Sequence, residues 1–167
     1  MIFVSVGTHS QPFTRLLKKI DELIEQKKIT EPVMAQVGYS DYPAKNYPTQ
    51  KFLGLAEFDE QVQTARIVIT HGGEGNIGAC LQHHKPMVIV PRLQKWGEHT
   101  NDHQLELTHA IVNAKKALLV LDIDDLEKAI DRAPGLVPAH APTPSAILGL
   151  LGAFTRTQFE KRGKTDA

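Results

Sequence analysis

Short apolar runs alternate along this chain with amphipathic segments, and this alternation restricts the possible folds more than any other feature. The runs are four or five residues long and end at glycine, proline or polar residues, as buried strands do. Between them, apolar residues recur at helical spacing, as in Phe13, Leu16 and Ile20. Strands are expected at residues 2–6, 33–37, 51–55, 67–70, 87–90 and 117–121, and helices from Pro12 to about residue 24 and at residues 57–65, 76–83, 101–113 and 123–133. The pattern predicts an α/β fold, a Rossmann-like parallel sheet with helices on both faces.

Length and composition fit a single domain. A chain of 167 residues can bury one sizeable core, and 41% hydrophobic with 23% charged residues is ordinary for a globular protein. We expect residues 1–167 to form one domain that ends in a proline-rich linker, residues 134–144, and a final helix, residues 145–161. The apolar stripe of that helix consists of Ile147, Leu148, Leu151 and Phe154. The stripe can pack on its own domain or dock on a partner, and the sequence leaves both open.

Charge and cysteine content exclude some classes of protein. Lys plus Arg and Asp plus Glu both number 19, so the whole-chain charge gives no argument for a nucleic-acid partner. The single cysteine, Cys80, excludes an internal disulfide framework and fits a reducing cytoplasm. The first residues lack the features of a signal peptide, and the apolar stretch 146–154 is too short to span a bilayer. These features predict a cytoplasmic protein.

Polar loops follow three of the expected strands. They are residues 7–11, 71–76 and 91–104. In a parallel sheet with right-handed crossovers, the loops after the strands gather at one edge, and ligands bind there. We therefore expect these three loops to meet and to form the binding site.

The second of these loops reads His-Gly-Gly-Glu-Gly-Asn, residues 71–76, between a strand and a helix. Glycines let the main chain approach a ligand closely, and free N–H groups at a helix start favour a phosphate. The loop is neither the Rossmann glycine motif nor a P-loop, since no Lys-Ser or Lys-Thr pair follows. An ordinary tight turn, with Asn76 as the helix cap, is the alternative.

The third loop concentrates polar side chains. Glu98, His99, Asn101, Asp102, His103 and Gln104 fall within seven positions. Such a density of donors and acceptors suits a sugar, although Asn101 and Gln104 also match a capping box that would only finish a helix. His99 and His103 are four residues apart and can face one way as metal ligands, but no third ligand has a diagnostic spacing. We therefore expect no metal site.

Taken together, the motifs resemble a known family. The opening MIFVSVGTHSQPFTRLLKKID, the loop THGG, and the run KPMVIVPR followed by GEHTNDHQ resemble the C-terminal, donor-binding half of GT-B glycosyltransferases, within glycosyltransferase family 28. More narrowly, the chain resembles the small subunit of two-part bacterial exopolysaccharide glycosyltransferases, which are related to the catalytic subunit of the eukaryotic GlcNAc transferase acting on dolichol-linked oligosaccharide. The resemblance covers about residues 1–125 and implies a single GT-B C-terminal-type lobe.

The resemblance also implies roles for individual residues. The diphosphate of a UDP-sugar would lie against Gly72, Gly73, Gly75 and Asn76, with His71 nearby, and the first loop would add Gly7, Thr8 and His9. Arg92 would frame the uracil side. The sugar would be contacted or positioned by Glu98, Asp102, His103 and Gln104. His9 and Glu98 are the candidate catalytic residues. His9 can act as the base that deprotonates an acceptor hydroxyl, or it can serve the phosphates.

One position departs from the family pattern. Many relatives carry a glutamate one turn into the helix after the glycine loop, where it holds the ribose hydroxyls. This chain has Ala79 there. Either another group, such as Glu74 or Glu98, takes the ribose, or UDP binds more weakly.

The resemblance further implies a partner. One lobe of a GT-B enzyme binds the donor, and this chain has room for one lobe. A membrane-attached partner subunit would supply the acceptor site and recruit the chain to the inner face of the membrane. The implied activity is transfer of a hexose from a UDP-sugar to a lipid-linked saccharide in polysaccharide biosynthesis, without a metal or other cofactor. The alternative is a non-catalytic nucleotide-sugar-binding subunit that activates a partner transferase; an epimerase of related fold would need both lobes in one longer chain.

Overall fold

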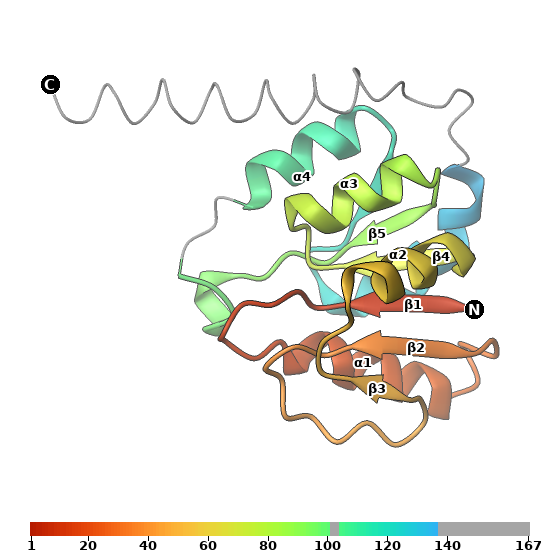
Figure 1. Cartoon of the computed structure of the whole chain (residues 1–167), viewed down its shortest axis with the longest axis vertical. Coiled ribbons are helices and arrows are strands. Elements are labelled where there is room, and N and C mark those ends of the chain that lie inside the picture. Colours follow the sequence, from red (N-terminus) through yellow and green to blue (C-terminus); the bar gives the residue numbers. More distant parts are fainter. Residues whose placement is uncertain (101–103, 137–167) are drawn as a thin grey trace, which may run out of the picture.

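The computed structural model describes residues 1–100 and 104–136, and its centre is a sheet of parallel strands (Figure 1). The strands are β1 (Ile2–Ser5), β2 (Val33–Gln36), β3 (Thr49–Gln50), β4 (Ile67–Thr70), β5 (Met87–Ile89) and β6 (Ala117–Leu119). Their order across the sheet is β3-β2-β1-β4-β5-β6, and every neighbouring pair is parallel. The predicted α/β fold with a Rossmann-like parallel sheet is therefore confirmed.

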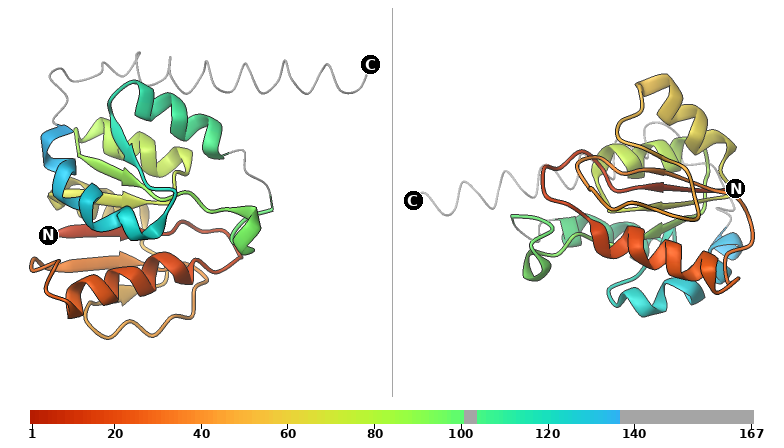
Figure 2. Two further views of the ribbon diagram at one scale, coloured as in Figure 1. Left: turned by 180° about the vertical axis from the view of Figure 1, so that it is seen from behind. Right: turned by 90° about the horizontal axis from the view of Figure 1, so that it is seen from below.

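Helices cover both faces of the sheet, as the strand–helix alternation predicts (Figure 2). One face carries α1 (Thr14–Glu25) and α5 (Leu126–Arg132), and the other carries α2 (Leu55–Thr64), α3 (Glu74–Gln82) and α4 (Gln104–Asn113). Short 3₁₀ turns occur at η1 (Gln94–Trp96), η2 (Ile123–Asp125) and η3 (Ala133–Leu136). The sheet is thus the middle of three layers.

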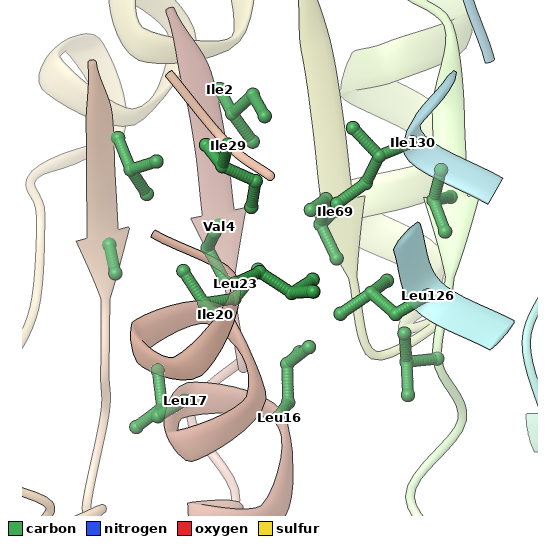
Figure 3. Close-up of a cluster of buried hydrophobic side chains, with 14 of the residues drawn as sticks. Ile2, Val4, Leu16, Leu17, Ile20, Leu23, Ile29, Ile69, Leu126 and Ile130 are labelled. Carbon is green, nitrogen blue, oxygen red and sulfur yellow. The ribbon is translucent and has the colours of Figure 1, made fainter. Parts of the chain in front are cut away.

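The central strands are buried on both sides because successive side chains point to opposite layers. From β1, Ile2 and Val4 point toward α1 and α5, in the cluster that also holds Ile69 and Ile130 (Figure 3). Phe3 points the other way, into the cluster beneath α2, α3 and α4. This two-sided burial explains why the strands are continuous apolar runs in the sequence rather than alternating ones.

The direction in which strands are added to the sheet reverses between β1 and β4. From β1 the chain builds outward through β2 and β3, and it then returns to add β4, β5 and β6 on the other side. At such a switch point the loops after the two strands diverge and leave a crevice beyond their carboxyl ends. The loops after β1 and β4 begin at Val6 and His71.

The third strand differs from its prediction. We expected residues 51–55, but β3 is Thr49–Gln50 and Leu55 already belongs to α2. The carboxylate of Glu57 accepts a hydrogen bond of 2.9 Å from the Gly54 N–H, so the helix starts earlier than its apolar spacing suggests. The Ala35 N–H donates a hydrogen bond to the Pro48 carbonyl, and the Val37 N–H donates to the Gln50 carbonyl. These bonds place residues 48–50 beside β2. Phe52 and Leu53 therefore lie in a connection rather than a strand, and Leu55 begins α2.

Other boundaries shift by a few residues. The helix expected at residues 76–83 begins at Glu74, and the one expected at residues 123–133 is divided into η2 and α5. Residues 134–136, expected to open a linker, belong to η3. The rest of that linker and the helix expected at residues 145–161 lie outside the described residues, as do residues 101–103 before α4.

None of the helices in the described ranges is both long enough and apolar enough to cross a membrane. The apolar stretch 146–154 lies outside these ranges.

Candidate functional site

The three polar loops that follow β1, β4 and β5 come together at the carboxyl edge of the sheet. The His71 N–H donates to the Ser5 carbonyl at 3.3 Å, which joins the second loop to the end of β1. The rings of His9 and His99 lie 4.4 Å apart between centroids, which joins the first loop to the third. The predicted meeting of the loops is therefore observed for the described residues, while Asp102 and His103 lie outside them.

Two glycines make room for the His71 imidazole. A side chain at either Gly7 or Gly73 would overlap the His71 ring. Gly7 also has φ = +78°, a left-handed conformation that other residues adopt only with strain. The ring is therefore held between two stretches of main chain, and this explains why glycine stands at both positions.

Burial keeps His71 neutral. Its side chain is 8% exposed, and burial, helped by the nearby Arg92 charge, lowers its pKa to about 4. Its Nδ1 atom is buried and has no hydrogen-bond partner among the described residues. A neutral imidazole carries one donor and one acceptor. The buried Nδ1 is therefore an exception, because nearly all buried polar atoms are hydrogen-bonded.

The start of α3 presents free main-chain N–H groups. Gly73 is the N-cap residue and has no side chain to satisfy them. The Asn76 amide instead donates to Ser5 Oγ at 2.8 Å and to Thr70 Oγ1 at 2.9 Å. The alternative in which Asn76 caps the helix is therefore wrong, because its side chain ties α3 to the ends of β1 and β4. The N–H groups and the helix dipole remain available for an anion.

A cavity of about 760 Å³ opens beside this helix start. Its polar end is lined by Gly7, Thr8, His71, Gly73, Gly75 and Asn76. Its other walls come mainly from the β3–α2 connection and from the facing sides of α2 and α3, namely Leu53, Leu55, Ala56, Phe58, Asp59, Ala79 and Gln82, with Gln36 from β2. The volume lies in the range of small-molecule sites, and the mixture of apolar walls with a few polar groups is typical of them.

Arg92 lies beneath the loops. Its side chain is fully buried, and it donates to the carbonyls of Val6 (2.8 and 3.1 Å), Gln11 (2.6 Å) and Glu98 (3.0 Å). Burial lowers the pKa of Arg92 to about 10, so it is still charged at neutral pH. Arg92 was expected to frame the uracil side of a donor, but it does not line the cavity. It holds the first and third loops together.

Glu98 is engaged in the same scaffold. It is 4% exposed, and its two carboxylate oxygens accept bonds of 2.9 Å each from the Arg15 guanidinium. One oxygen also accepts the Leu93 N–H at 3.1 Å. Like Arg92, Glu98 does not line the cavity. Its carboxylate anchors the loop after β5 to α1, and it is not free to act as a base or to bind ribose.

His9 is held in one orientation. The Gln11 N–H donates to His9 Nδ1 at 3.3 Å. A neutral imidazole that accepts at Nδ1 carries its proton on Nε2, so Nε2 is a donor. Burial lowers the pKa of His9, and the neighbouring His99 and Arg92 lower it further. In this tautomer the Nε2–H of neutral His9 can donate a hydrogen bond but cannot accept a proton.

Sequence comparison identifies the family. The profile of the "Glycosyltransferase family 28 C-terminal domain" matches residues 1–134. The chain belongs to this family. No curated protein matches the sequence of this family 28 domain significantly.

Solved structures share the fold of this family 28 domain. The glycotransferase of kitacinnamycin superposes with a TM-score of 0.63 at 20% identity, over 90% of this chain and 37% of that one. The calicheamicin glycosyltransferase CalG4 superposes with a TM-score of 0.58 at 16% sequence identity, over 97% of this chain and 41% of CalG4. A UDP-glucose:anthocyanidin 3-O-glucosyltransferase in complex with UDP superposes with a TM-score of 0.54 at 12% sequence identity, over 94% of this chain and 35% of that enzyme. The chain thus spans less than half the length of these proteins, and the likeness shows a GT-B-type lobe.

Several lining residues of this family 28 domain escaped the sequence analysis. Leu53, Leu55, Phe58 and Asp59 follow β3, whose end was placed too late in the chain, so the connection after it was not counted among the loops at the carboxyl edge. A correct end for β3 identifies this connection by the same rule that identified the other loops.

Metal ligation receives no support from the residues described. Within residues 1–100 and 104–136, no three side chains of His, Cys, Asp or Glu are grouped as metal ligands would be. His103, half of the pair considered from the sequence, lies outside them, as does the side chain of Gln104.

Proposed function

We propose that this chain is the donor-binding part of a glycosyltransferase and that its cavity binds a UDP-sugar. The observation that carries the proposal is the position of the cavity in a family 28 domain: it lies at the switch point of the sheet, with the open start of α3 at one end. A structural neighbour with the same fold was solved in complex with UDP.

The two ends of the cavity suit the two ends of a nucleotide. In our proposal the diphosphate lies against the N–H groups of α3 between Gly73 and Asn76, with Thr8 and His71 beside it. The uracil lies against the apolar wall of Leu53 and Phe58. The sugar extends toward the third loop, where His99 and the expected ligands Asp102, His103 and Gln104 follow.

Departure of UDP requires stabilisation of negative charge on the leaving phosphate. The dipole and amides of α3 provide it in our proposal, and the Nε2–H of His9 adds a donor, so no metal is needed. Since His9 is held as a donor and Glu98 is bound to Arg15, we assign the acceptor-activating base to a partner. Arg92 and Glu98 then act as positioning residues.

A partner subunit is supported by the distribution of exposed apolar side chains. Among the described residues, the large hydrophobic side chains with high exposure are Tyr39, Phe52, Leu55, Trp96 and Leu121. Every one of them follows the carboxyl end of a strand, the edge at which the cavity opens. We propose that a membrane-attached subunit with the acceptor site packs on this edge, recruits the chain to the inner face of the membrane, and presents a lipid-linked saccharide of a polysaccharide pathway.

A non-catalytic role is the second candidate. The observation that favours it is that neither His9 nor His71 is arranged as a base. In that case the chain binds the nucleotide sugar and activates a transferase without contributing to the chemistry.

Calorimetry and a transfer assay test these proposals. The full chain should bind UDP and UDP-sugars but bind UMP more weakly, because UMP lacks one of the two phosphates held by α3. Failure to bind UDP would refute the donor site. With a co-expressed membrane subunit, radiolabelled hexose should appear in the lipid extract. Loss of transfer in a His9→Ala variant that still binds UDP supports the catalytic role, and retained transfer supports the second candidate.

A further inference from the structure

We infer that Asp59 binds the ribose hydroxyls of the donor nucleotide, held in place by His83. The inference rests on the proposed binding of a nucleotide in the cavity and adds the residue that recognises its sugar. Asp59 lies on α2, and sequence analysis gave it no role.

The cavity runs between one face of α2 and one face of α3. Gly75, Ala79 and Gln82 line it from α3, and their spacing of four and three residues places them on one stripe of the helix. Phe58 and Asp59 line it from α2. A ligand whose phosphates lie at the start of α3 therefore extends along this stripe, and one turn further, about 5.4 Å, it passes Ala79, which has no polar side-chain atom.

Asp59 supplies the polar group on the opposite wall. Its side chain is 50% exposed, and its Oδ1 lies 2.7 Å from His83 Nε2. His83 is the C-cap residue of α3 and is 16% exposed, so the contact joins the two helices that form the walls. Within the described residues no other hydrogen bond involves the Asp59 carboxylate, so Oδ2 is free to accept.

The chemistry of a carboxylate matches ribose at this point. An ionised carboxylate only accepts hydrogen bonds, and the 2′ and 3′ hydroxyls of ribose both donate. The same charge repels phosphate, so Asp59 disfavours a reversed nucleotide while the amides of α3 attract the diphosphate. Asp59 thus helps to fix the direction in which the nucleotide lies.

Other carboxylates near the site are already engaged or do not line the cavity. Glu98 is bound by Arg15, and Glu57 accepts the N–H of Gly54. Glu74 lies in the first turn of α3 but does not line the cavity. In the described part of the chain, Asp59 is therefore the carboxylate placed to reach the ribose.

The test compares UDP with 2′-deoxy-UDP by calorimetry on the full chain. Wild type should bind UDP at least tenfold more tightly than the deoxy analogue. Asp59→Asn should weaken UDP binding about tenfold and change the deoxy affinity less than threefold, since a bond to an ionised group is worth more than one to an amide. Glu60→Gln, on the exposed side of the same helix, is the matched control and should match wild type.

A second variant tests the role of His83. His83→Ala should also reduce the preference for UDP, and the double variant with Asp59→Asn should lose no more than Asp59→Asn alone, because His83 acts through the carboxylate. Thermal unfolding of each variant checks that the fold is intact. We expect the Asp59 variant to fold, because its side chain is half exposed.

The outcomes separate the two proposals. If wild type binds UDP but does not discriminate against 2′-deoxy-UDP, or if folded Asp59→Asn retains the wild-type preference, the assignment of Asp59 is overturned and the donor site remains. If wild type binds neither nucleotide, the proposed function fails and the assignment of Asp59 fails with it.

Discussion

Arg92 donates two hydrogen bonds to the carbonyl of Val6, so the loop after β5 is fixed to the end of β1. The fork of the guanidinium also reaches Gln11 and Glu98 from its remaining nitrogen. A lysine keeps the charge but has no planar fork and cannot reach all three carbonyls. We expect Arg92→Lys to lower the free energy of unfolding by about 2 kcal/mol in urea denaturation at pH 7.

An exposed arginine provides the control for Arg92. Arg66 donates to Glu31 at the surface, with 46% of its side chain exposed. Arg66→Lys should cost less than about 1 kcal/mol, as surface ion pairs do. Equal losses in the two variants would show that Arg92 is not the buried link described here.

Gly75 and Gly78 lie on the same helix and have open space around them, but only Gly75 lines the cavity. Alanine is a better helix former than glycine, so neither Gly75→Ala nor Gly78→Ala should destabilise the protein. A methyl group at Gly75 should nevertheless obstruct a phosphate. We expect Gly75→Ala to weaken UDP binding at least fivefold in calorimetry while Gly78→Ala leaves it unchanged.

Gly73 is a less useful position for this experiment. A side chain there overlaps the His71 ring, so lost binding would not distinguish a blocked phosphate site from a displaced histidine. If Gly75→Ala binds UDP as tightly as wild type, the phosphates do not lie at the start of α3.

His71 should make stability depend on pH. Because burial lowers its pKa from 6.5 to about 4, the unfolded chain binds more protons than the folded one between these values. The contribution is absent above pH 6.5, and it destabilises the fold progressively as the pH falls toward 4. At pH 4.5 it should amount to about 2 to 3 kcal/mol.

A variant without the imidazole isolates this contribution from that of the carboxylates, which also titrate in acid. His71→Gln should lose about 2 to 3 kcal/mol less than wild type between pH 7 and pH 4.5 in urea denaturation. His109→Gln, at an exposed position on α4, should behave as wild type. The same acid loss in His71→Gln and wild type would mean that His71 is not buried as a neutral ring.

Much of the fold followed from local pattern alone. The strands from β1 to β5, apart from β3, are buried on both faces, and two-sided burial selects continuous apolar runs that are visible in a sequence. The error at β3 has a local cause: Phe52, Leu53 and Leu55 are as apolar as a strand, but they lie at the surface or line the cavity. The residue type alone does not distinguish an apolar side chain that lines a binding site from one that is buried in the core.

The site was predictable in outline but not in detail. The loops beginning at Gly7 and His71 were found because the ends of parallel strands share one edge. The environments of Glu98 and Asp59 were not predictable, because they depend on Arg15 and His83, which contact them across 83 and 24 residues of sequence. Such long-range pairs produce no recognisable spacing of residues in the sequence. They nevertheless decide which carboxylate is free to bind a ligand.

Trp96 lies in the loop after β5, at the edge proposed for the partner. It ends η1, and Gly97 follows with φ = +68°. Lys95 Nζ lies 5.4 Å from the indole centroid, and Leu121 borders the same groove. The indole is 60% exposed although Trp is costly to leave in water. Tryptophan is enriched among the residues that contribute most to binding at protein interfaces.

We therefore expect Trp96→Ala to weaken association with the proposed membrane-attached subunit at least tenfold, measured by surface plasmon resonance with the detergent-solubilised candidate partner. Stability should change by less than about 0.5 kcal/mol, because the side chain is mostly exposed, and UDP affinity should not change, because Trp96 does not line the cavity. Lys18→Ala, on the exposed face of α1, is the control and should bind the partner normally. Partner binding that survives Trp96→Ala would place the interface elsewhere, and a fall in UDP affinity would mean that the loop after β5 serves the donor instead.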